Sequence, residues 1–228
     1  MADFDGQPRP AGREVTSDQD FLVLHTLRCI GFVTEGRLAA VSGLSPEEAA
    51  GRLAGLAQLD LVSSTPGPFG GWALTDRGRV TGEAMLGDEL ERTDASDQIR
   101  RGYEAFLRLN PTLLQICTDW QMVRVGDTHV VNEHLDRGYD ARVLDRLVRI
   151  DQGAQRICSD LTAALSRFAV YGTRLGDALD RALAGDTSYV TDDFDAYHTV
   201  WFQLHEDLLA TLGISRAVER NSRVPSLG

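Results

Sequence analysis

The chain has no lysine: all 23 of its basic residues are arginine, set against 34 aspartate and glutamate residues. The resulting net charge of −11 argues against non-specific binding to nucleic acid as the main activity. Arginine does suit bidentate contacts with guanine and phosphate, although a GC-rich genome would also produce this composition. A site-specific DNA-binding protein is therefore compatible with this charge only if arginines gather on one local surface.

Long apolar runs and paired cysteines are also lacking. No segment approaches the roughly 20 apolar residues of a membrane-spanning helix, and the acidic start lacks the layout of a signal peptide. We therefore expect a cytoplasmic protein with no membrane partner. Cys29, Cys117 and Cys158 lie far apart in the chain. They form no closely spaced pair, so we expect neither a disulfide framework nor a zinc ribbon.

Residues 17–92 carry the signals of three helices, a hairpin and a further helix, after a flexible arm over residues 1–16. Ser17 and Thr34 are suited to cap the first two helices. Ser45, followed by Pro46 and by Glu48 at the third helical position, is a strong signal for the start of the third. Two short β-prone runs then flank a loop rich in glycine and proline, which predicts a hairpin.

Three short motifs in this region occur in a recognisable order. They are a Leu-Ser pair before the third helix, a Leu-Val pair at 61–62 and a Trp-Ala-Leu-Thr run at 72–75 that leads into Arg77 and Gly78. Together they resemble bacterial winged helix-turn-helix regulators of the MarR-like type. The resemblance implies that the helix after Ser45 lies in the major groove of double-stranded DNA and that the hairpin touches the backbone.

The resemblance also implies which side chains contact DNA. The expected DNA-binding residues are Arg37, Ser45, Arg52, Arg77 and Arg79. Arg52 is the one side chain on the exposed face of the third helix that is able to read guanine edges or hold phosphate. The hairpin loop, however, contains no basic residue, and Glu47 and Glu48 open the third helix. This departure keeps open an alternative in which the domain docks on another protein without binding DNA.

The remainder of the chain reads as an all-α bundle over residues 97–220. Helical periodicity extends over residues 97–109, 111–124, 140–165, 167–184 and 192–212. The expected fold class is therefore mainly α, with an N-terminal winged helix-turn-helix followed by a helical bundle. We expect this second domain to dimerise the protein.

Polar groups are mixed into two apolar, aromatic-rich stretches of the bundle, which is costly unless those groups are paired. One interpretation is an effector pocket made by Asp119, Trp120, Gln121, Tyr197, His198, Trp201, Phe202 and His205. The other is a hydrogen-bonded core network that sets the helix register. The seven-residue spacing of His198 and His205 is too long for two metal ligands on adjacent turns of a helix. We therefore expect no metal and no cofactor.

The leading hypothesis is a homodimeric, DNA-binding transcriptional regulator with a small-molecule effector. The first alternative is the protein-docking module described above. The chain lacks a nucleophile elbow and a phosphate-cradling loop, so we do not expect an enzyme. A catalytic site around Asp119, His198 and His205 is the third hypothesis.

Overall fold

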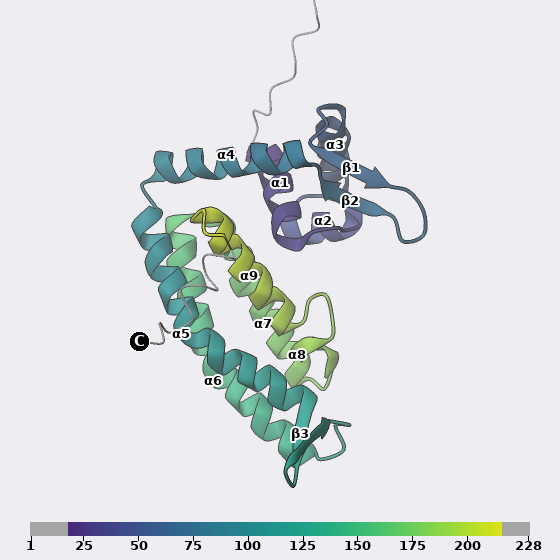
Figure 1. The fold of residues 1–228 in the computed structure, drawn as a ribbon, viewed down its shortest axis with the longest axis vertical. Helices are drawn as coiled ribbons and strands as arrows, with labels where there is room; N and C mark the ends of the chain where they lie inside the picture. The colour runs from purple at the N-terminus through teal and green to yellow at the C-terminus, as the bar shows by residue number, and fades with distance from the viewer. Residues whose placement is uncertain (1–17, 216–228) are drawn as a thin grey trace, which may run out of the picture. The chain divides into compact units, whose positions relative to one another are not determined.

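The computed structural model describes residues 18–215, which are mainly helical with two short antiparallel hairpins (Figure 1). The chain divides into two compact units, and the boundary lies between Gly82 and Glu83. This boundary falls inside α4 (Asp76–Thr93), so one helix contributes to both units. The arm predicted over residues 1–16 lies outside the described residues, as do residues 216–220 of the predicted bundle.

The N-terminal unit begins with three helices, α1 (Asp18–Ile30), α2 (Glu35–Ser42) and α3 (Pro46–Gln58). The predicted caps of α2 and α3 are confirmed, while Ser17 lies outside the described residues. The Thr34 hydroxyl accepts a hydrogen bond from the Arg37 backbone N–H, and Ser45 and Glu48 form a complete capping box at α3. Since Gly43 ends α2 with a φ of 72°, α2 and α3 follow one another with only a short turn between them.

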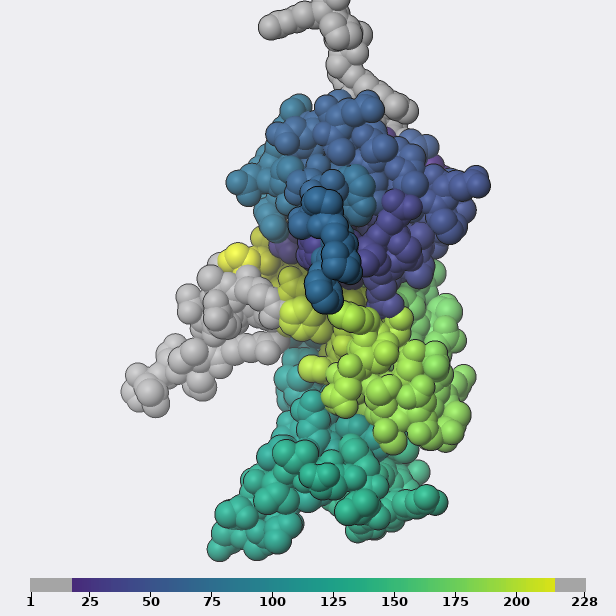
Figure 2. Space-filling model, turned by 90° about the vertical axis from the view of Figure 1, so that its right-hand side faces the viewer, coloured from purple at the N-terminus to yellow at the C-terminus, as the bar shows by residue number. Residues whose placement is uncertain are grey.

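A two-stranded antiparallel hairpin follows α3. Strand β1 (Val62–Thr65) pairs with β2 (Gly71–Leu74), and Val62 stands opposite Leu74. Val33, in the connection between α1 and α2, adds a bridge to this hairpin: its backbone N–H donates to the Trp72 carbonyl over 3.1 Å, and the Trp72 N–H donates back over 2.7 Å. Figure 2 shows the dark blue hairpin loop protruding from the surface.

Apolar side chains from α1, α2 and α3 form the core of this unit. Leu24, Leu38 and Leu53, one from each helix, have no exposed surface. The start of α4 packs closely against the residue that precedes β1, so that a Cβ at Gly78 would overlap the backbone carbonyl of Leu61. The three helices, the hairpin and the first turns of α4 therefore make one packed body.

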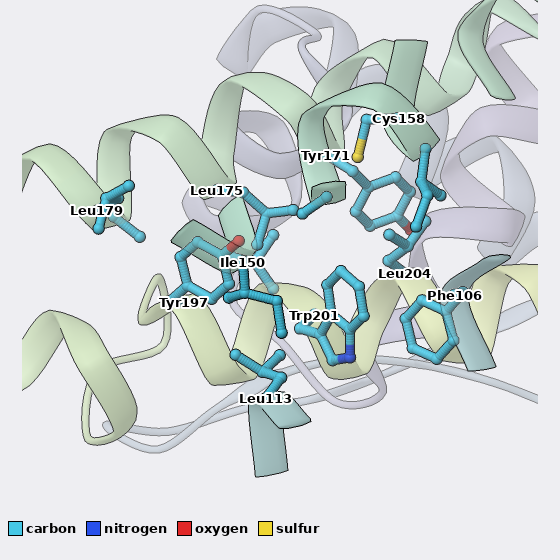
Figure 3. Close-up of a cluster of buried hydrophobic side chains, with 14 of the residues drawn as sticks. Phe106, Leu113, Ile150, Cys158, Tyr171, Leu175, Leu179, Tyr197, Trp201 and Leu204 are labelled. Carbon is cyan, nitrogen blue, oxygen red and sulfur yellow. The ribbon is translucent and has the colours of Figure 1, made fainter. Parts of the chain in front are cut away.

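The C-terminal unit is built on long helices (Figure 1). Its elements are α5 (Ser96–Gln121), β3 (Met122–Val125), β4 (Thr128–Val131), α6 (Arg137–Ala164), the 3₁₀ turn η1 (Ser166–Phe168), α7 (Ala169–Leu183), α8 (Ser188–Thr191) and α9 (Tyr197–Thr211). Helices α5, α6, α7 and α9 bury a continuous core, part of which is drawn in Figure 3. Phe106, Leu147, Leu175 and Leu204 are fully buried there.

Two details of this unit correct the prediction from sequence. The expected interruption at Pro111 is absent, because α5 runs through the proline without ending. Asn110 and Leu113 on either side are buried in the core while Pro111 itself is exposed, so packing of the flanking residues outweighs the missing backbone hydrogen bond.

The second correction concerns the expectation of an all-α bundle with a helix over residues 111–124. The helix ends at Gln121, and β3 and β4 form a hairpin with Met122 opposite Val131. The sequence contains a signal for this hairpin, because each strand has two valines and a glycine lies between them. Gly126 adopts a φ of 63° in the turn. The helical periodicity of residues 111–121 does not continue into the strand.

Candidate functional site

The exposed face of α3 is the surface that the resemblance assigns to DNA. Its exposed residues include Ser45, Glu47, Glu48, Gly51, Ala54 and Ala57. Apart from the two glutamates these side chains are small and uncharged, so the net charge of these residues is negative. The Ser45 hydroxyl is already engaged, because it accepts the Glu48 backbone N–H over 3.2 Å.

Arg52, the only arginine of α3, is turned toward α1. Its guanidinium donates to the Gln19 amide oxygen over 2.7 Å and approaches the Asp20 carboxylate at 3.4 Å. Gln19 also donates to the carboxylate of Glu48. Hydrogen bonds from the Ser45 backbone, the Ser45 hydroxyl and Gln19 lower the pKa of Glu48, which keeps this carboxylate charged. Arg52 is therefore committed to a polar network between two helices of its own unit.

The other predicted DNA contacts lie to either side of α3. Arg77 and Arg79, at the start of α4, are exposed, while Arg37 on α2 is half-buried. The loop between β1 and β2 has no charged residue, and at its tip the Phe69 side chain is 93% exposed. The exposed arginines of residues 18–82 thus lie at the start of α4, rather than on α3 or at the hairpin tip.

The negative charge of the chain is unevenly distributed between the two units. Residues 18–82 contain seven acidic and five basic side chains, whereas residues 83–215 contain 23 acidic and 13 basic side chains. Most of the excess therefore belongs to the C-terminal unit. Electrostatic repulsion between the N-terminal unit and a polyanion is much weaker than the net charge of the whole chain implies.

Two of the predicted effector residues lie in the packed core of the C-terminal unit. The Trp201 ring stacks on Phe106 with centroids 4.3 Å apart, and its Nε1 donates to the Asn110 side chain over 2.9 Å. The His205 ring lies 4.8 Å from that of Phe106. These contacts are those expected of a hydrogen-bonded core network.

The remaining predicted residues on α9 differ in exposure. Tyr197 is buried, and its hydroxyl donates to the Asp151 carboxylate over 2.9 Å. Burial and this neighbouring carboxylate raise the pKa of Tyr197. His198 is half-buried, which lowers its pKa, and Phe202 is 48% exposed.

The predicted residues at the end of α5 have a different set of partners, next to the β3–β4 hairpin. Asp119 pairs with Arg146 of α6 at 2.5 Å, and Gln121 is exposed. Trp120 is buried, and its ring lies 4.6 Å from that of His134. The eight predicted effector residues are thus not gathered around one hollow: Trp120, Tyr197 and Trp201 belong to the core, whereas Gln121 and Phe202 are exposed.

Residues that follow the β3–β4 hairpin form a polar cluster that was not predicted from the sequence. The His134 Nδ1 lies 3.1 Å from one Asp140 oxygen, while the Asn132 amide donates to the other over 2.9 Å. Asn132 also donates to the Trp120 carbonyl and accepts the His134 backbone N–H. His134 has a φ of 56°, which few residues other than glycine adopt. These hydrogen bonds fix the connection between β4 and α6. No sequence motif indicates the cluster.

Among residues 18–215, no helix combines the length and the apolar character needed to cross a membrane. Searches of this chain against protein-family models, curated proteins and solved structures find no match.

Proposed function

We propose that this protein is a DNA-binding transcriptional regulator whose N-terminal unit is a winged helix-turn-helix. The observation that carries the proposal is the closely connected helix pair α2–α3 followed by an antiparallel hairpin, to which Val33 adds a third short backbone pairing. A winged helix uses this order of elements to place its second helix in the major groove and its hairpin near the backbone. Action on chromosomal DNA would require the cytoplasmic location that the sequence predicts.

The charge distribution supports the same proposal in a specific form. With Arg52 engaged by Asp20 and Gln19, the exposed Arg77 and Arg79 are the cations best placed for phosphate contacts. Few phosphate contacts mean modest non-specific affinity and a shallow dependence on salt. Recognition of the DNA base sequence by α3 would then depend on its small side chains and on the shape of the DNA as much as on charge.

The proposed regulator acts as a homodimer, because a two-fold symmetric DNA site is bound by two DNA-binding domains, one from each subunit. We assign part of the subunit contact to α4, the helix that follows the hairpin and leads into the second domain. Val80 on that helix is 66% exposed, which is consistent with an apolar contact there. Sedimentation equilibrium of the full chain tests this directly, and a single species of 25.0 kDa across the concentration range would contradict it.

Selection of bound fragments from genomic DNA with the purified protein is the first test of DNA binding. If a site is recovered, Arg77→Ala and Arg79→Ala should each weaken binding to that site and to unrelated DNA similarly, and lower the salt slope by about one. Arg156→Ala, at an exposed position of α6, is the matched control. Failure to enrich any sequence, together with no effect of the two variants, would reject the proposal.

A second candidate function is protein docking through the same unit. The observations that favour it are the two carboxylates on the exposed face of α3 and the exposed Phe69 at the hairpin tip.

The Glu47→Gln variant distinguishes DNA binding from protein docking. Removing one negative charge should strengthen DNA binding about two- to fivefold at low salt if α3 faces phosphate. It should weaken capture of a basic protein partner if α3 is a docking surface. Glu104→Gln on α5 is the control.

A further inference from the structure

A cavity of about 520 Å³ lies at the β3–β4 hairpin. Its lining comes from the end of α5, from both strands, from the connection over residues 132–136 and from Tyr139 of α6. This volume lies within the range of small-molecule sites, about 300–1,000 Å³. Asp119 is the one residue of the predicted effector set that contributes to this lining.

Five apolar side chains contribute to the walls of the cavity. Met122, Val123 and Val130 contribute from the strands, together with Val131, which is 64% exposed. Leu135 in the connection is 86% exposed. Large apolar side chains gathered around a cavity and left open to water are typical of a surface that a ligand covers.

Tyr139 and Asn132, two polar residues of the lining, already have partners within the protein. The Tyr139 hydroxyl lies 2.8 Å from the Asp119 carbonyl and 3.3 Å from that of Met122. The Asn132 amide is held by Asp140 and by the Trp120 carbonyl. These bonds hold the lining rigid, as a preformed site requires. They involve neither His129 nor Glu133, two exposed polar side chains of the lining, so these groups and the apolar walls determine what binds.

The uncompensated charge around the cavity is negative. Asp119 is neutralised by Arg146, and Arg124 is engaged by the Gly126 carbonyl and by Asp127. Glu133 is exposed and makes no ion pair with any residue between 18 and 215.

Asp136, the other carboxylate of the connection, caps α6 by accepting the backbone N–H groups of Gly138 and Tyr139. Glu133 is therefore the principal charge available to a ligand. Apolar walls beside an unpaired carboxylate are complementary to an organic cation.

We propose that this cavity binds a hydrophobic monocation, with its apolar body against Val131 and Leu135 and its charge near Glu133. Its use as an effector site rests on the proposed regulatory function, whereas the binding itself does not. The two can be tested apart, because the titration uses the full chain with no DNA present.

Tetraphenylphosphonium and tetraphenylborate make a suitable pair of probes, because they have the same shape and opposite charge. Isothermal titration of the full chain should show tetraphenylphosphonium binding at least tenfold tighter than tetraphenylborate. Glu133→Gln should weaken phosphonium binding about fivefold through loss of one Coulomb interaction. Leu135→Ser should weaken the binding of both ions, because it removes apolar contact rather than charge.

Glu104→Gln, an exposed acidic position on α5 that does not line the cavity, is the control and should bind phosphonium as the wild type does. Circular dichroism of each variant verifies that the fold is retained. Equal or tighter binding of the borate, unchanged phosphonium affinity in Glu133→Gln or in Leu135→Ser, or absence of phosphonium binding would each overturn the proposal. A failed DNA selection would leave these titrations unaffected.

Discussion

The guanidinium of Arg52 on α3 lies 3.4 Å from the carboxylate of Asp20 on α1. The pair joins the helix assigned to the DNA groove to the first helix of the unit, and Gln19 extends it to Glu48. Arg52 can reach DNA only by giving up these bonds. If Arg52 contacts DNA as the sequence predicts, a phosphate must compete with the Asp20 carboxylate for its guanidinium.

This competition predicts opposite effects for the two members of the pair. Arg52→Ala should lower the free energy of unfolding by about 1 kcal/mol, since partly exposed ion pairs contribute little. If Arg52 contacts DNA, Asp20→Asn should release it and strengthen binding to the selected site, whereas Arg52→Ala should abolish specific binding. Fluorescence anisotropy with a labelled duplex measures both. Unchanged affinity in both variants would remove Arg52 from the interface.

The close packing of α4 against the hairpin predicts a large difference between two glycine substitutions on the same helix. Gly78→Ala should destabilise the N-terminal unit by roughly 2–4 kcal/mol, because its Cβ would overlap the Leu61 carbonyl and force the backbone apart. Gly87→Ala should stabilise the helix by about 0.5–1 kcal/mol, since no atom lies within 4 Å of that Cβ. Urea denaturation measures both changes. Equal changes in the free energy of unfolding for the two variants would mean that α4 is not packed against Leu61.

A buried ionic network in the C-terminal unit supplies a third prediction. Arg167 in η1 donates to Glu89 of α4 over 2.9 Å and to Asp207 of α9 over 2.5 Å. Tyr171 also donates to Asp207. Burial alone would disfavour the charged guanidinium, but the two carboxylates outweigh it and raise the pKa of Arg167.

Removing Arg167 should therefore leave two partly or fully buried carboxylates without their cation. Arg167→Met should lower the free energy of unfolding by about 3–5 kcal/mol. Replacing Asp207 with leucine in the same protein should restore part of this loss, because one of the uncompensated charges is removed as well. Arg156→Met, on the exposed side of α6, is the control. A loss in Arg167→Met no larger than in this control would show that the network contributes no stability.

His198 gives the protein a pH dependence of known sign. Burial lowers its pKa in the folded protein below the ordinary value of about 6.5. The unfolded chain therefore binds a proton first, and stability that is complete above pH 6.5 falls as the pH decreases toward the folded-state pKa. The difference in unfolding free energy between pH 7.5 and 5.5 should be smaller in His198→Gln than in the wild type. An equal or larger difference would contradict this assignment.

Features that depend on neighbours in the chain were predictable. Thr34 and Ser45 cap α2 and α3 as predicted because a capping bond joins residues only a few positions apart. The hairpin β1–β2 follows from its glycine- and proline-rich loop for the same reason. The β3–β4 hairpin carried a comparable signal in its valines and Gly126, which was masked by the strong helical periodicity immediately before it.

The arrangement of candidate site residues could not be obtained in this way. Sequence patterns identified Trp201, Tyr197 and His205 as candidates for a pocket or a core network, but their partners Asn110, Asp151 and Phe106 come from α5 and α6. Whether such groups line a hollow or pack against one another depends on which helices meet and in what register. No local pattern encodes this.

The starts of α2 and α3, the β1–β2 hairpin and the division of charge along the chain were thus already present in the amino-acid order, because each depends on short-range bonds or on composition. The direction taken by Arg52, the passage of α5 through Pro111 and the cavity beside Leu135 required the folded chain. Each depends on contacts between residues distant in sequence, where the burial of neighbouring side chains outweighs local preference.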